Sequence, residues 1–265
     1  MSDNDLIRTL AGHIKTRHHT VIRPHRDPVE NPDANRIIGG KSGAFRAAIF
    51  GANDGLVSNL SLIMGVAGAT SSNSTHIVVL AGVAGLLAGA FSMGAGEYVS
   101  MRVQRELFER LIHIEAHELA TEPDEETEEL TKIYESRGIP SDLAQRITSV
   151  IHENPELALE THAREELGLD PDELGSPWGA AISSFVMFSL GALIPLLPFV
   201  FGSGVAAVVS AVAASGIALF ALGSAMSYFT GRNPVWSGSR MLLVGAAAAA
   251  ITFGVGRLLN AKAGI

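Results

Sequence analysis

Residues 177–231 read PWGAAISSFVMFSLGALIPLLPFVFGSGVAAVVSAVAASGIALFALGSAMSYFTG, a run of 55 residues without a charged side chain. A helix that crosses a bilayer needs about 20 mostly apolar residues, because each residue rises ~1.5 Å and the hydrocarbon core is ~30 Å thick. The run is long enough for two crossings, and Gly202 and Gly204 mark the turn between them. A second uncharged run, residues 55–96, rules out a water-soluble enzyme and predicts an integral membrane protein.

The pattern predicts an all-α fold with five transmembrane helices and a helical domain inserted between the second and the third. The expected spans are residues 46–69, 76–101, 178–201, 204–228 and 241–259. The chain accordingly divides into a tail at 1–45, two helices within 46–101, the inserted domain at 102–176 and three helices within 177–265.

Basic residues are distributed unevenly between the two faces of this topology. The tail through Arg46, the inserted segment and the loop at 231–240 together carry 17 Lys and Arg, whereas the opposite face carries only Arg257 and Lys262. Because positively charged residues are retained in the cytoplasm, we expect the tail and the inserted domain there and the C-terminus outside. No secretory leader is recognisable at the start, so insertion is expected to begin at the first span, in the cell membrane of a prokaryote.

The tail is basic and has three prolines in its second half, so we expect a loosely ordered leader. An alternative is a short amphipathic helix through Leu6, Leu10 and Ile14 that lies on anionic lipid. Four tail histidines leave metal capture as a further alternative, although a polar basic tail gathers histidines by chance. They are His13, His18, His19 and His25.

The inserted segment is strongly acidic, with 20 of the 27 Asp and Glu and an excess of 13 negative charges. Apolar residues keep helical spacing from Val103 to Ile114, so the second span is expected to continue as one helix until Pro123. Three more helices are expected at 124–137, 141–153 and 155–167. Their start and stop signals are Ser141 as an N-cap, Pro155 in a first turn, and Gly138 and Gly168 beyond the ends.

Two acidic residues, Asp54 and Glu97, lie within or at the end of apolar spans. An ionised side chain at such a depth costs several kcal/mol unless water, a partner or a cation compensates. Met93 precedes Glu97 by one helical turn, and a thioether beside a carboxylate suits Fe²⁺ better than Mg²⁺ or Ca²⁺. The alternatives are a hydrogen-bonded helix contact for Asp54 and ordinary packing for Met93.

The inserted domain offers a second group of candidate metal ligands. They are Glu115 and Glu118, Glu126 and Glu129, and His162 with Glu165 and Glu166. A spacing of three or four residues places each set on one helix face, and facing carboxylates repel each other unless cations lie between them. The alternative is a solvated acidic surface.

Several classes of chemistry are excluded. The chain has no cysteine, so it has neither disulfides nor thiolate zinc sites. The sequence contains no Glu-x-x-His pair and no Walker loop. The zinc-protease motif that starts at His152 is incomplete, because its fifth position is Glu156 instead of a histidine. We therefore expect no enzyme, no prosthetic group and no nucleic-acid partner.

Four features in order resemble the vacuolar iron transporter family over about residues 44–260. They are GANDGL at 51–56, Ser92-Met-Gly94, the long acidic insert, and LGALIPLLP at 190–198. The resemblance implies a five-helix homodimer that moves Fe²⁺, and often Mn²⁺, out of the cytosol in exchange for protons. It makes the inserted segment a cytoplasmic metal-binding domain.

The resemblance also implies residue roles. Asp54 and Met93 match positions on the translocation path, and Pro123 holds a turn between metal-binding glutamates. The matching glutamates are Glu115, Glu118, Glu126, Glu129 and Glu166. Two departures stand out: Gly85 replaces a membrane glutamate of plant members, which Glu97 would then supply, and His162 replaces a methionine. A neutral imidazole is also a good ligand for Fe²⁺, Mn²⁺ or Zn²⁺.

The sequence therefore predicts a proton-coupled exporter of Fe²⁺ and Mn²⁺, in which the metal is cargo. One rival is a membrane-anchored metal buffer or sensor without transport, which has no need of Asp54 in the bilayer. Another is an exporter of a different small solute, which leaves the paired acidic helices unexplained.

Overall fold

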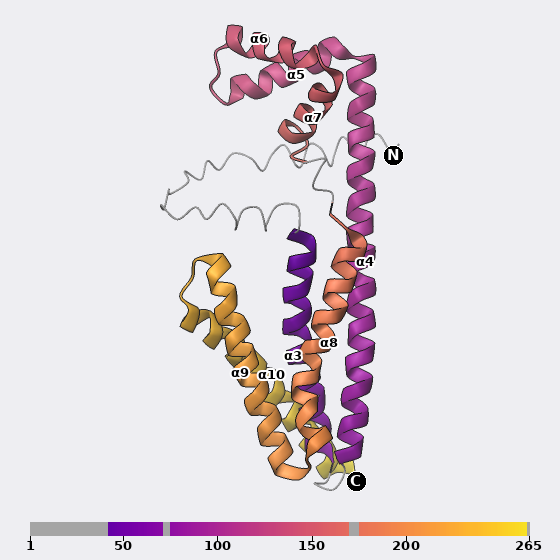
Figure 1. Ribbon diagram of the computed structural model, residues 1–265, viewed down its shortest axis with the longest axis vertical. Coiled ribbons are helices and arrows are strands. Elements are labelled where there is room, and N and C mark those ends of the chain that lie inside the picture. The colour runs from indigo at the N-terminus through magenta and orange to yellow at the C-terminus, as the bar shows by residue number, and fades with distance from the viewer. Residues whose placement is uncertain (1–41, 71–74, 170–174, 264–265) are drawn as a thin grey trace. The chain divides into compact units, whose positions relative to one another are not determined.

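The computed structural model describes residues 42–70, 75–169 and 175–263. This part of the chain consists of helices and short connections, without strands (Figure 1). The helices are α3 (Ser42–Ala69), α4 (Thr75–Thr121), α5 (Pro123–Ser136), α6 (Ser141–His152), α7 (Pro155–Glu165), α8 (Pro177–Phe201), α9 (Gly204–Thr230) and α10 (Pro234–Ala263). The expectations for the tail, including its histidines, fall on residues 1–41 and lie outside the described residues.

Five of these helices, α3, α4, α8, α9 and α10, are long and apolar enough to cross a membrane. Helix α3 packs against the other four. Many large apolar side chains on these helices point outward, among them Leu80, Ile217 and Leu243. A soluble monomer rarely exposes so much apolar surface, whereas a bilayer or a second membrane subunit covers it without cost.

The contact between α3 and α8 depends on glycines. A Cβ built on Gly51 would lie 2.6 Å from the carbonyl oxygen of Ser184, and one built on Gly55 would overlap the carbonyl oxygen of Phe188. The two backbones touch because neither glycine has a side chain, as is common where membrane helices approach closely. This contact fixes the rotation of α3 and so the direction in which Asp54 points.

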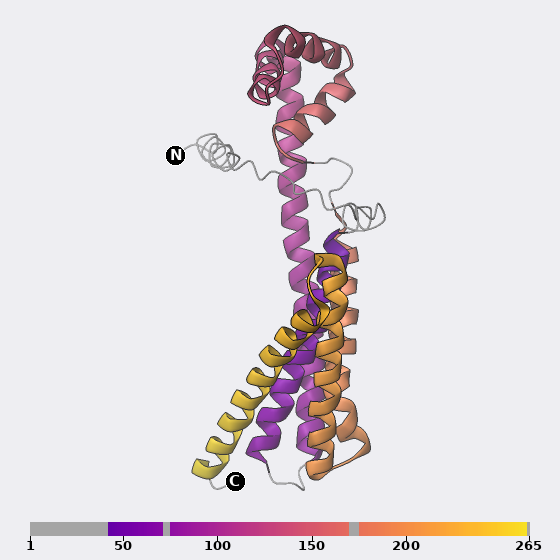
Figure 2. The same cartoon turned by 90° about the vertical axis from the view of Figure 1, so that its left-hand side faces the viewer.

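Helix α4 is continuous over 47 residues (Figure 2), so the expected extension of the second span is confirmed. Two expected boundaries were wrong. Ser141 is the first residue of α6 rather than its N-cap, because Pro140 takes that place without a side-chain bond. Helix α10 begins at Pro234 rather than near Met241, because the side-chain oxygen of Asn233 accepts hydrogen bonds from two backbone N–H groups of its first turn.

Helices α5, α6 and α7 fold together beside the far end of α4. They bury Leu130, Ala144, Ala158 and Ala163 between them. The side chain of Asn154 caps α7, with Pro155 next to it as expected. Glycines 138 and 168 follow α5 and α7 with φ of 91° and 66°, a region that favours glycine, so the expected stops are confirmed.

Candidate metal centre

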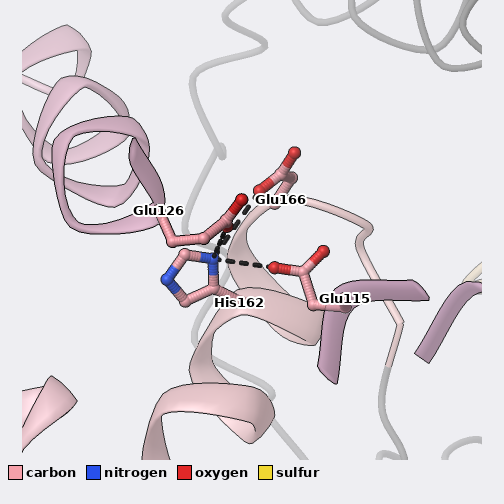
Figure 3. Close-up of side chains that lie close together, drawn as sticks. All are labelled: Glu115, Glu126, His162 and Glu166. Carbon is pink, nitrogen blue, oxygen red and sulfur yellow. Dashed lines mark ion pairs between the residues drawn. The ribbon is translucent and has the colours of Figure 1, made fainter. Parts of the chain in front are cut away.

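Four predicted ligands from three helices meet at one point (Figure 3). Glu115 comes from α4, Glu126 from α5, and His162 and Glu166 from the end of α7. The Nδ1 atom of His162 lies 2.9 Å from Oε1 of Glu115, 3.4 Å from Oε2 of Glu126 and 3.7 Å from Oε2 of Glu166. One ligand atom from each residue lies within 4.8 Å of all the others.

This cluster is buried, and His162 meets the carboxylates through ion-pair contacts rather than well-formed hydrogen bonds. His162 is 0% exposed, Glu115 3% and Glu126 6%. The Nδ1 atom of His162, Oε1 of Glu115 and Oε2 of Glu166 make no hydrogen bond to any described residue. Buried polar groups without partners cost free energy. One nitrogen and three carboxylate oxygens around a common point match the preferences of Fe²⁺, Mn²⁺ and Zn²⁺, so a divalent cation would remove this cost.

Protons take part in the balance of charge at the cluster. Burial raises the pKa of Glu126 to about 7, and the charge of Glu115 adds to this shift while His162 opposes it. Burial by itself lowers the pKa of His162, but the carboxylates of Glu115, Glu166 and Glu126 outweigh that effect and raise this pKa to about 9. At neutral pH the metal-free cluster therefore holds an imidazolium, and a metal that binds Nδ1 must displace its proton.

Three further predicted ligands lie outside this group of four. Glu118, one turn along α4 from Glu115, is half-buried, and burial together with neighbouring glutamates raises its pKa. Glu129 is half-buried on α5. Glu165 makes an ion pair with Arg137.

Sequence reasoning missed two residues next to the cluster. The Nε2 atom of His152, at the end of α6, lies 3.0 Å from Nε2 of His162, and Oγ1 of Thr127 lies 2.8 Å from Nδ1 of His152. These three side chains come from three helices, so no spacing along the chain links them. The only available signal was that Thr127 directly follows Glu126.

A second candidate site lies within the membrane-spanning helices. A cavity of about 240 Å³ is lined by Asp54 and Met93, the two positions that the resemblance assigns to the translocation path. The other residues along its wall are Ser58, Asn59, Leu62, Gly85, Gly89, Ser92 and Phe188. Glu97 is not among the lining residues, although its Oε2 is buried and makes no hydrogen bond to the described residues.

Asn59 is a polar residue of this cavity that sequence reasoning also missed. Its side-chain N–H donates to the carbonyl oxygen of Ala192 at 2.7 Å, while its Oδ1, on a side chain only 2% exposed, makes no hydrogen bond to the described residues. A Cβ at Gly85 would lie 3.0 Å from that oxygen and would overlap Leu62. At position 85 this chain therefore presents a glycine with an amide oxygen beside it.

Comparison with known proteins decides the family. The model of the VIT family matches residues 45–257, a range that contains both the membrane cavity and the cluster of α4, α5 and α7. The chain belongs to the VIT family. The family expected from the motifs is thus confirmed.

Relatives of this VIT family member are similar along most of their length. It is 35% identical to a vacuolar iron transporter of Centaurea cyanus over 213 residues, 80% of this chain and 86% of the relative. It is 34% identical to the vacuolar iron transporter of Acanthamoeba castellanii over 232 residues, 87% and 84% of the two chains. It is 32% identical to vacuolar iron transporter 1 of Arabidopsis thaliana over 216 residues, 81% and 86%. Together with the five apolar helices, these relatives show a multi-pass membrane protein.

Proposed function

We propose that this protein transports divalent metal, Fe²⁺ and also Mn²⁺, out of the cytosol in exchange for protons. The names of its relatives support iron as the cargo. The observation that carries the proposal is the cavity among membrane-spanning helices with Asp54 and Met93 in its wall. A carboxylate at that depth costs free energy unless it binds a cation or a proton. An exchanger of metal for protons must bind each of these in turn.

The cluster of Glu115, Glu126, His162 and Glu166 is the cytosolic loading site in this proposal. Its excess of negative charge attracts divalent ions, and the site gives up a proton from His162 when one binds. The cation then passes to the cavity at Asp54, where metal and proton compete for one carboxylate. Nothing in this scheme requires covalent chemistry, so the proposed activity is transport.

The excess of basic residues on the side of α5, α6 and α7 supports a cytosolic position for that side. The outward-facing apolar side chains of the spanning helices leave room for a second subunit, so the proposal includes a homodimer in the bilayer. Metal ions, protons, lipid and a second copy of the chain are the proposed partners.

The rival function is a membrane-anchored metal buffer or sensor, which the loading site alone would also support. Purified protein in liposomes that enclose a metal-quenched dye separates the two. A transporter passes many Fe²⁺ ions per protein into the lumen and quenches the dye continuously. A buffer binds a fixed number of ions outside and leaves the dye bright.

A further inference from the structure

The ring of His162 has a second hydrogen-bonded side that faces away from the carboxylates. Its Nε2 lies 3.0 Å from Nε2 of His152, and Nδ1 of His152 lies 2.8 Å from Oγ1 of Thr127. The Thr127 hydroxyl donates in turn to the carbonyl oxygen of Pro123 at 2.7 Å. An unbroken row of polar atoms thus runs from the backbone of α5 through the end of α6 to α7.

The direction of each hydrogen bond in this row follows from the first one. A hydroxyl has a single hydrogen; with that of Thr127 on its nearer acceptor, the carbonyl oxygen of Pro123, Oγ1 accepts the N–H of His152 at Nδ1. A neutral imidazole has one N–H and one lone pair, so Nε2 of His152 must accept. The hydrogen between the two rings therefore belongs to Nε2 of His162.

That assignment leaves Nδ1 of His162 as the atom that offers a lone pair, and Nδ1 is the atom that the three carboxylates surround. We propose that Thr127 and His152 are positioning residues that hold His162 in the tautomer and ring orientation in which Nδ1 binds the metal. This inference rests on the proposed role of the cluster as a metal site. Histidine ligands in metalloproteins usually donate their other N–H to an acceptor, most often a carboxylate, a backbone carbonyl or water, and removal of that acceptor typically lowers metal affinity about 10–100-fold. Here the acceptor is the imidazole of His152.

The test measures Mn²⁺ binding to the full-length protein in detergent. Binding that is lost in Glu115→Gln is assigned to the cluster. His152→Leu removes the acceptor and should lower the Mn²⁺ affinity of the cluster by about 10–100-fold. His152→Gln should restore most of it, because the amide oxygen accepts from Nε2 of His162 and the amide N–H donates to Thr127. A purely space-filling role for His152 would not distinguish Gln from Leu in this way.

A matched pair of threonines isolates the hydroxyl. Thr127→Val removes Oγ1 at nearly constant shape and should weaken binding by about tenfold. Thr131→Val is the control, because Thr131 lies one turn further on α5 and makes the same kind of hydrogen bond to the backbone of its own helix. Pulsed electron paramagnetic resonance should show a directly bound imidazole nitrogen on Mn²⁺ in the wild type and in His152→Gln, and a weakened signal in His152→Leu.

The outcomes separate this inference from the proposals on which it rests. Wild-type affinity in Thr127→Val and His152→Leu, with loss in Glu115→Gln, would overturn the positioning role alone. Equal weakness of His152→Leu and His152→Gln would overturn it as well. Unchanged binding in Glu115→Gln would remove the metal site and this inference with it. If the variants change Mn²⁺ affinity as expected but the wild-type protein carries no Fe²⁺ into liposomes, the proposed transport function alone would be contradicted.

Discussion

At the scale of single residues, the proposed metal site around His162 is one at which a proton and a metal ion would compete for the same atoms. Without metal, the imidazolium lies among the carboxyl groups of Glu115, Glu126 and Glu166, whose negative charges would otherwise repel one another in a buried site. The raised pKa values of His162 and Glu126 describe how strongly that balance holds protons. Both protons must leave before all four ligands can coordinate a cation.

Metal affinity should therefore fall as pH falls. Between pH 9 and pH 7 only the His162 proton competes, so affinity should drop by up to about tenfold per pH unit. Below pH 7 the proton of Glu126 competes as well and the dependence should steepen. Mn²⁺ titrations of the full-length protein from pH 5.5 to 9 measure this slope, and an affinity independent of pH would contradict the role of His162.

Stability should respond in the opposite direction when metal is absent. The folded-state pKa of His162 lies above its usual 6.5, so its protonated form stabilises the fold below pH 6.5 and this contribution is lost as pH rises towards 9. Glu126, raised from 4.5, loses its contribution between pH 4.5 and 7. The melting temperature of metal-free protein should decline from pH 6 to 9, and Mn²⁺ should restore it most at pH 9. A metal-free melting temperature that rises over this range would contradict the assignment.

Replacement of the proposed ligand Glu115 should lower metal affinity more than replacement of an exposed glutamate of the same helix, α4. Glu115→Gln removes a charge close to the cation, and one charge pair at 4 Å with an effective dielectric constant of 20 contributes about 4 kcal/mol. We expect a loss of at least about tenfold in cluster affinity by calorimetry. Glu106→Gln is the control on α4, because Glu106 is exposed and pairs with Arg102. Equal losses in both variants would indicate diffuse attraction to an acidic surface.

At the scale of helices, local patterns predicted some features and packing determined others. The continuous α4 follows from apolar spacing without a helix breaker, and α5 and α7 follow from their prolines and the glycines after them. The early start of α10 was not predicted, because residues 231–240 have the polar composition of a loop. The hydrogen bonds by which Asn233 caps the helix are visible only in the structure. The glutamates and His162 were recognisable from composition and spacing. Their partners His152 and Thr127, and Asn59 in the cavity, depend on tertiary contacts that no period along the chain encodes.

The glycine contacts of α3 give a prediction at this scale. Gly55→Ala should destabilise the protein by about 1–3 kcal/mol, because its Cβ would overlap the backbone of α8 at Phe188 and separate the helices that frame the cavity. Gly254→Ala is the control on α10, where an added Cβ meets nothing within 4 Å and helix propensity favours alanine. Thermal unfolding in detergent compares the two variants. Equal stability would mean that α3 and α8 separate without cost.

At the scale of the whole molecule, the orientation in the membrane decides which side supplies the metal. The proposed topology places Ser136, the last residue of α5, in the cytosol and Ser203, between α8 and α9, outside it. Both residues are exposed, and the chain has no cysteine of its own. A membrane-impermeant thiol reagent on intact cells should label Ser203→Cys and not Ser136→Cys. The reverse pattern would invert the topology and place the loading site outside.

Exchange of metal for protons is the central claim, and flux under an imposed pH gradient tests it most directly. Proteoliposomes with an acidic lumen should take up Fe²⁺ faster than those without a gradient, and the lumen should become more alkaline as the metal enters. Asp54→Asn keeps the shape of the side chain but removes its ionisable group, so it should abolish the gradient-driven part of this uptake. Fe²⁺ uptake that is equal with and without the gradient, or unchanged in Asp54→Asn, would contradict the account.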